Sequence, residues 1–135
     1  MHTVQRRVGR LVEIRMGLPL TSAEAVIFAE ELRAIVKPMA DRFVGVCDFT
    51  RVSIFPQEVI STYTDCMREL NPKVERTGVL ISNSATFGMQ IGRLIRGAAS
   101  PNRRTFVNPT ELCLWLAEVL TPAEQARVKE FLAGA

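Results

Sequence analysis

Two short segments that are almost wholly apolar constrain the fold of this chain most strongly. The first is Phe43-Val-Gly-Val-Cys-Asp48, apolar until its last residue, and the second is Thr77-Gly-Val-Leu-Ile81. Strands with so few polar positions need cover on both faces, and the strands of a parallel sheet have that cover. Each segment is followed by a longer one with helical apolar spacing, which is typical of crossover helices. The sequence therefore predicts an α/β fold.

The N-terminal region is expected to add a hairpin to this sheet. Residues 2–8 and 10–16 are predicted strands, because apolar and charged residues alternate over residues 12–15. Gly9 between them suggests a tight turn. The first strand then runs antiparallel to the second, so the predicted sheet is mixed but mostly parallel.

The remaining elements follow from helix and strand boundary signals. We expect helices at residues 22–37, from Pro56 to Asn71-Pro72, at 84–97 and after each of Asn108 and Thr121, and a short strand at 104–107. The predicted order is β-β-α-β-α-β-α-β-α-α. This corresponds to one domain over residues 1–135, with about five strands and about five helices.

Two helices carry more specific signals. Thr21-Ser-Ala-Glu24 matches a capping box at the start of the first helix. Gly88 and Gly92 lie four residues apart in the third helix, where each costs roughly 1 kcal/mol relative to alanine. We interpret the two glycines as a sign that this helix closely approaches a neighbour.

Composition makes several classes of protein improbable. No apolar run reaches the roughly 18 residues that span a bilayer, so no transmembrane segment is predicted. The basic N-terminus has no apolar stretch behind it and does not match a secretory signal. Cys47, Cys66 and Cys113 are widely spaced inside predicted elements, which favours reduced cysteines and a cytoplasmic location.

The usual catalytic groups are also missing. The only histidine is His2, expected at a mobile terminus, so a histidine-based triad or metal site is not predicted. No glycine-rich phosphate loop is present. We therefore expect a protein that is not an enzyme and that has no cofactor. An enzyme that uses Asp48, Tyr63 or Cys47 is the alternative.

Positive charge is concentrated in two regions. Residues 1–20 carry four arginines and one acid, and residues 84–107 carry four arginines and no acid. Such a region can bind an anion, or it can simply be a solvated face. Because the arginines are not interleaved with aromatic residues, no nucleic-acid partner is predicted.

Candidate binding residues gather where predicted strands end, since ligands of open α/β sheets bind outside the carboxyl ends of the strands. They are Asp48, Thr50, Ser53, Gln57, Glu58, Ser82, Ser84, Arg93 and Arg96. Asp48 could orient a polar ligand or a partner's arginine, or it could cap its own turn. The two serines could hold an anion at a helix N-terminus, or act as ordinary N-caps. The two arginines could contact phosphates or an acidic protein.

The element order and four stretches carry a resemblance to a known family. The stretches are Leu11–Arg15, Val44–Thr50, Arg104–Val107 and Cys113–Leu116. Together they resemble the STAS domain, the fold of bacterial anti-sigma-factor antagonists. The likeness is closer to the STAS-like family of small bacterial proteins grouped with the CRAL-TRIO lipid-binding domains, and it covers nearly the whole chain. The resemblance implies a regulatory or protein-interaction module.

The resemblance also implies a specific position for regulation. In anti-sigma-factor antagonists a kinase phosphorylates a serine of an Asp-Ser-Ser-Gly pattern after the central strand. The corresponding stretch here is Phe55-Pro-Gln-Glu58, which has no serine. Phosphorylation at this point is therefore not expected. Glu58 could imitate the charge of a phosphate, or it could be an ordinary acid in a first helical turn.

Two functions from different classes remain. The first is docking of a protein partner at the strand–helix edge. The second is binding of a small apolar ligand or lipid in a cleft between helices and sheet, suggested by the CRAL-TRIO grouping and the glycines of the third helix. A homodimer through an exposed helix or the N-terminal edge strand is also open, although Arg6 and Arg7 could blunt that edge.

Overall fold

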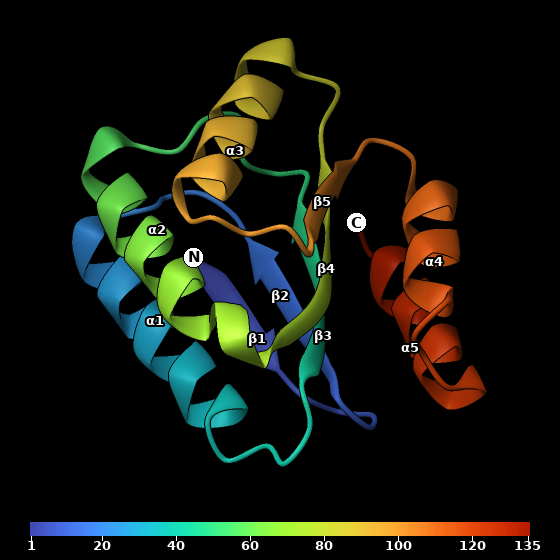
Figure 1. Cartoon of the computed structure of the whole chain (residues 1–135). Coiled ribbons are helices and arrows are strands. Elements are labelled where there is room, and N and C mark those ends of the chain that lie inside the picture. The colour runs from blue at the N-terminus through green and yellow to red at the C-terminus, as the bar shows by residue number, and fades with distance from the viewer.

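A five-stranded sheet forms the middle layer of the computed structural model, which describes residues 1–135 (Figure 1). Helices cover both faces of the sheet. The elements are β1 (His2–Gln5), β2 (Leu11–Met16), α1 (Ser22–Val36), β3 (Phe43–Phe49), α2 (Gln57–Leu70), a 3-10 turn (Asn71–Lys73), β4 (Val74–Ile81), α3 (Ala85–Gly97), β5 (Arg103–Phe106), α4 (Pro109–Ala117) and α5 (Pro122–Leu132). The predicted order and the α/β class are confirmed.

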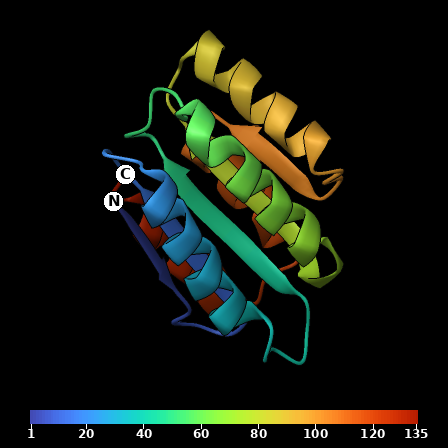
Figure 2. The same cartoon turned by 90° about the vertical axis from the view of Figure 1, so that its left-hand side faces the viewer.

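The strands lie side by side in the order in which they occur in the chain. β1 pairs antiparallel with β2, and β2, β3, β4 and β5 pair in parallel. Each parallel connection is expected to be right-handed, so successive steps in one direction place every crossover helix on the same face. Figure 2 shows α1, α2 and α3 side by side on that face. The mixed, mostly parallel sheet is therefore as predicted.

The other face of the sheet is covered by the last two helices. α4 and α5 follow the final strand and lie on the side opposite α1–α3 (Figure 1). Every residue of β3 is buried, as expected for a central strand with helices on both sides.

The alternation of side chains along the strands divides the interior into two cores. Cys47 belongs to a core of 25 buried residues beneath α1–α3, whereas Val46 belongs to a core of 11 beneath α4 and α5. The larger core lies between the sheet and the three crossover helices, the third predicted helix among them.

Several residues at the starts of helices form the capping hydrogen bonds expected at those positions. Ser84 Oγ accepts from the N–H of Phe87 at 3.3 Å, and Asn108 Oδ1 accepts from two N–H groups of α4. The capping box is complete at Thr121. At Thr21 only half of it forms. Thr21 accepts from the N–H of Glu24, but the Glu24 carboxylate turns away to the N-terminal amine and His2.

His2 is not at a mobile terminus, so that expectation is wrong. It lies in β1, and its side chain is only 8% exposed. Its ring meets Phe28 edge-on, and its two nitrogens contact the carboxylates of Glu24 and Glu31 at 3.2 and 3.0 Å. Pairing of β1 with β2 and cover by α1 hold the residue in place.

The prediction of close approach at Gly88 and Gly92 is also wrong. A methyl group at Gly88 would meet only Ile81 Cδ1, at an ordinary 3.7 Å, and at Gly92 only the side chain of Arg96 in the same helix. The crowded glycines lie in the sheet. At Gly45 the added carbon would come within 2.8 Å of Thr77 Oγ1, and at Gly78 within 3.0 Å of Leu112.

The three cysteines lie inside helices and strands, as the sequence predicts. All three cysteines are free, Cys47 and Cys66 are buried, and Cys113 is half-buried. No helix has the length and apolar character needed to cross a membrane.

Candidate functional site

The segments that follow β2, β3, β4 and β5 meet at one edge of the sheet, the upper edge in Figure 1. We call it the carboxyl edge. Parallel strands all end there, so their connections to the helices gather at that edge. Most of the predicted site residues follow strands at this edge, but their surroundings differ widely.

Asp48 is buried at the end of β3, with a side chain only 1% exposed. Its Oδ1 accepts from the N–H and hydroxyl of Thr50 at 3.0 and 2.7 Å, and its Oδ2 accepts from Arg15 Nε at 2.9 Å. Burial alone would raise the pKa of the Asp48 carboxyl. The hydrogen bonds from Thr50 and Arg15 outweigh that effect and hold the pKa below its ordinary value.

The partner of Asp48 is itself tied to α5. Arg15 Nη2 donates to the carbonyl of Phe131 at 2.7 Å, and the guanidinium lies 4.2 Å from the centre of the Phe131 ring. Asp48 and Thr50 therefore fix a turn and help to dock α5 beneath the sheet. Of the two interpretations of Asp48, capping of its own turn is the one observed, and its carboxylate is enclosed by protein rather than presented to a partner.

The two serines of the β4–α3 connection lie at the start of α3. Ser84 is the N-cap of that helix. Ser82 is half-buried, and its carbonyl accepts from the N–H of Ser84 at 2.8 Å. For Ser84 the hydrogen bonds match the ordinary N-cap interpretation, whereas Ser82 takes part only through its backbone carbonyl.

Gln57 and Arg93 come together, although they belong to different helices. Both line an open groove of about 290 Å³ between α2 and α3, together with Ile60, Thr64, Gln90 and Leu94. The Gln90 amide bonds α3 to the β3–α2 connection. Its Oε1 accepts from the N–H of Phe55 at 2.7 Å, and its Nε2 donates to the Phe55 carbonyl at 2.8 Å.

The remaining predicted residues do not line this groove. Ser53, Glu58 and Arg96 are exposed. Neither Arg93 nor Arg96 takes part in a salt bridge. Their guanidinium groups are therefore free to meet an acidic surface.

Exposed apolar side chains at the carboxyl edge were not predicted. Leu18 follows β2, Ile54 follows β3, Met89 lies in the second turn of α3, and Val107 follows β5. Each is more than half exposed. We call these four residues the apolar row. Single apolar residues in connections form no periodic pattern, so only the strand topology could bring them to the same edge.

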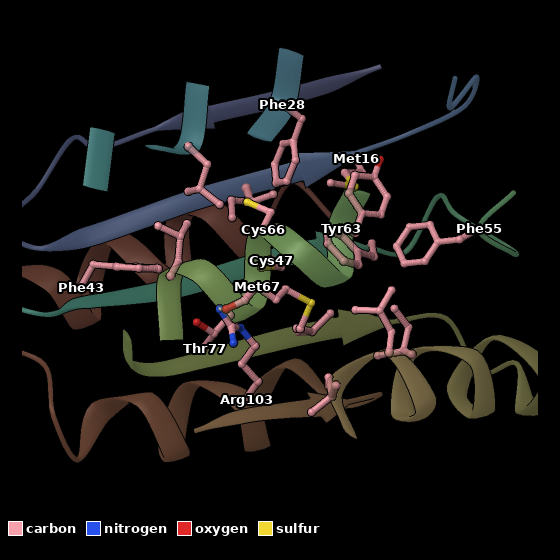
Figure 3. Close-up of a pocket in the computed structure, with 18 residues that line it drawn as sticks. Met16, Phe28, Phe43, Cys47, Phe55, Tyr63, Cys66, Met67, Thr77 and Arg103 are labelled. Carbon is pink, nitrogen blue, oxygen red and sulfur yellow. The ribbon is translucent and has the colours of Figure 1, made fainter. Parts of the chain in front are cut away.

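A separate cavity of about 80 Å³ lies inside the larger core, between the sheet and α1–α3 (Figure 3). Of the 18 residues that line it, 16 are apolar, and the two polar ones are Thr77 and Arg103. Figure 3 shows these two side chains beside each other, away from Phe55. Sequence reasoning predicted a cleft between helices and sheet and counted Arg103 among the arginines of a basic region, but it placed neither Arg103 nor Thr77 in the cleft.

The cavity does not activate its nucleophilic side chains. Burial raises the pKa of the Cys47 thiol to about 12 and that of the Tyr63 phenol to about 12, and it also raises the pKa of Cys66. These groups are protonated at neutral pH, and a protonated thiol is a poor nucleophile. No group of three His, Cys, Asp or Glu side chains is arranged to hold a metal ion.

Comparison with known proteins adds no assignment. No protein-family model matches the chain. A search of curated proteins finds no significant match.

Proposed function

We propose that this chain is a non-enzymatic protein-interaction module of STAS-like type, which docks a protein partner at its carboxyl edge. The observation that carries the proposal is the apolar row. Scattered exposed apolar residues are ordinary, but several gathered at one edge favour an interaction surface. Leu18, Ile54, Met89 and Val107 come from four separate segments of the chain and are all more than half exposed.

Charge at the same edge indicates what kind of partner fits. Arg51 follows β3 directly, and Arg93 lines the groove next to Met89. Both are exposed, and neither forms a salt bridge. An apolar centre with a cationic rim suits a partner that presents apolar side chains flanked by acidic ones.

The proposed surface differs from the one that the sequence suggests. Gln57 and Arg93 remain in it, with Glu58 and Ser53 at its margin. Asp48 and Thr50 are left out because their polar groups bond to each other and to Arg15. The STAS-like resemblance supports this location for docking. Regulation by phosphorylation is not part of the proposal, since Phe55-Pro-Gln-Glu58 has no serine.

Site-specific photo-cross-linking tests the proposal. A photoreactive residue is introduced at position 54 and, as a matched control, at position 114. Leu114 is 66% exposed but lies on α4, on the other side of the sheet. In an extract of the source cells, position 54 is expected to give a discrete cross-linked product and position 114 is not.

A substitution at Met89 tests whether the apolar row is the docking surface. Met89→Asp is expected to reduce the product at position 54 by about tenfold, because a charge within an apolar contact must be desolvated. Leu114→Asp is the control and should leave the product unchanged. Circular dichroism checks that both variants fold. Equal labelling at positions 54 and 114, or labelling that Met89→Asp does not reduce, would contradict the proposal.

A further inference from the structure

The two polar residues that line the cavity beneath α1–α3, Thr77 and Arg103, lie in line with a glycine across the sheet. Gly45, Thr77 and Arg103 are register neighbours on β3, β4 and β5. Any side chain at position 45 would come within 2.8 Å of Thr77 Oγ1. Glycine at this position therefore leaves the Thr77 hydroxyl open toward the cavity.

Thr77 is the first residue that indicates a ligand site. It is 5% exposed, and its Oγ1 is the only buried side-chain polar atom of the chain without a hydrogen-bond partner. A buried hydroxyl without a partner is costly, and folded proteins rarely leave one in that state. A ligand atom that accepts from this hydroxyl would remove that cost.

Arg103 supplies the second sign. Its Nη1 donates to Asn71 Oδ1 and Ser100 Oγ, and its Nη2 donates to the Met67 carbonyl at 3.3 Å. A guanidinium has five N–H donors, so Nε and one hydrogen of Nη2 have no protein acceptor. Arg103 forms no salt bridge, and all its acceptors are neutral. A half-buried cation without a counter-charge favours an anion beside it.

The least buried part of the cavity lining includes Arg103. Met67, Ile95 and Arg103 are the only lining residues that are half-buried, and all the others are buried. Arg103 contacts Met67 directly, and it contacts Ser100, whose N–H donates to the Ile95 carbonyl. These half-buried residues lie near the C-terminal ends of α2 and α3, so a ligand would enter there.

The size of the cavity limits the ligand. An apolar cavity of about 150 Å³ accepts benzene in another protein. By that comparison, 80 Å³ has room for an apolar group of about three to four carbon atoms. A lipid tail of ordinary length is too large for the cavity.

We infer that this cavity binds a short-chain monocarboxylate. Its carboxylate would accept from the Thr77 hydroxyl and the free donors of Arg103, and its alkyl chain would lie among the apolar side chains. Charge-assisted hydrogen bonds supply the specificity, and exclusion of the alkyl chain from water supplies the remaining affinity. This site is separate from the apolar row, so its test is independent of the proposed protein docking.

Titration calorimetry with a series of carboxylates tests the inference. The series consists of acetate, propionate, butyrate, valerate and octanoate, with 1-butanol and 1-pentanol as uncharged controls. Affinity is expected to be highest at butyrate or valerate, where the chain fills the cavity, and to fall at octanoate. Each alcohol is expected to bind about tenfold more weakly than the acid of the same length, because it offers Arg103 no charge.

Three variants locate the site. Thr77→Val and Arg103→Gln are each expected to weaken butyrate binding by about tenfold. Thr105→Val is the matched control, because Thr105 is a strand threonine that does not line the cavity, and it should bind butyrate as the unchanged protein does. Thr77→Val removes only a hydroxyl that has no protein partner, so its thermal midpoint without ligand should be unchanged or higher. A lost fold therefore cannot imitate lost binding in that variant.

Three results would overturn the inference. The first is the absence of heat from every carboxylate at millimolar concentration, which would mean that Thr77 is satisfied by water alone. The second is equal binding of the acids and alcohols. The third is butyrate binding that Thr77→Val and Arg103→Gln leave unchanged.

Discussion

Glu13 and Arg127 lie 114 residues apart in the chain and form a two-point ion pair that fastens α5 to β2. Arg127 Nε donates to Glu13 Oε2 at 2.9 Å, and Nη2 donates to Oε1 at 2.7 Å. The Glu13 side chain is wholly buried and that of Arg127 is 14% exposed. Together with Arg15 and Asp48, the pair gives the sheet beneath α5 a polar section beside its apolar core.

The first prediction concerns removal of one partner of this pair. Arg127→Ala should lower the free energy of unfolding by about 3 kcal/mol, because a buried carboxylate is left without its counter-charge. The double variant Glu13→Leu with Arg127→Met should recover most of that loss, since it leaves no buried charge. Urea unfolding of the three proteins measures both values. A double variant that is no more stable than Arg127→Ala would show that the unpaired Glu13 carboxylate is not the cause of the loss.

The second prediction concerns acid. The pKa values of Asp48 and Glu124 are below their ordinary values of 3.8 and 4.5. Burial opposes this shift, but hydrogen bonds from Thr50 and Arg15 to Asp48, and from the N–H groups of Thr121 and Arg10 to Glu124, outweigh it. A carboxyl with a lowered folded-state pKa stabilises the fold above its unfolded-state pKa. That contribution disappears as the pH falls through the folded-state pKa.

The free energy of unfolding should therefore be nearly constant between about pH 7 and 5 and fall steeply below about pH 4. Urea unfolding at a series of pH values gives the slope. Asp48→Asn should make the slope smaller, because one titrating group is removed. An identical slope in the variant would show that Asp48 does not contribute to acid sensitivity.

The third prediction concerns the thiols. Burial raises the pKa of all three thiols, that of Cys47 to about 12, but Cys113 is half-buried whereas Cys47 and Cys66 are buried. A disulfide reagent at neutral pH should therefore react first with Cys113, and with the other two only through unfolding. Absorbance of the released thiol gives the rates, and Cys113→Ser should remove the fast phase. A fast phase that survives in this variant would place another cysteine at the surface.

The fourth prediction compares two glycines. Gly88→Ala should raise the free energy of unfolding by about 1 kcal/mol, because alanine is the better helix former and its methyl group meets only Ile81 at 3.7 Å. Gly45→Ala should lower it, since the new methyl group would lie 2.8 Å from Thr77 Oγ1. Thermal unfolding of both variants ranks them. Combining Gly45→Ala with Thr77→Ala should restore part of the loss, and no recovery would place the strain elsewhere.

The prediction of secondary structure succeeds where local signals are strong. The buried strand at Phe43, the N-cap at Ser84 and the helices that begin after Asn108 and Thr121 are all found as expected. Each depends on the spacing of neighbouring residues or on a side chain that bonds to its own backbone. The prediction fails where a contact with a distant residue determines the position of a side chain. At Glu24 the carboxylate binds the N-terminal amine instead of completing a capping box.

At the candidate site, too, local signals are predicted correctly and distant contacts are not. The sequence predicts that Gln57, Ser82 and Arg93 follow strands of one sheet, but it does not indicate that Gln57 and Arg93 line a common groove. Nor does it indicate that Asp48 is turned inward to Arg15. Such pairs depend on register between strands and on which face each residue occupies.

Apolar spacing was enough to predict the α/β class, the order of the elements and the burial of the central strand, because the spacing along a segment specifies how that segment must be covered. Only the tertiary structure decided which polar groups meet. Arg15 reaches Asp48, Arg127 reaches Glu13, and Thr77 and Arg103 share a cavity, each through contacts between segments far apart in the chain. The physical reason is that burial of apolar area is nondirectional, whereas hydrogen bonds and ion pairs depend on the three-dimensional positions of both partners.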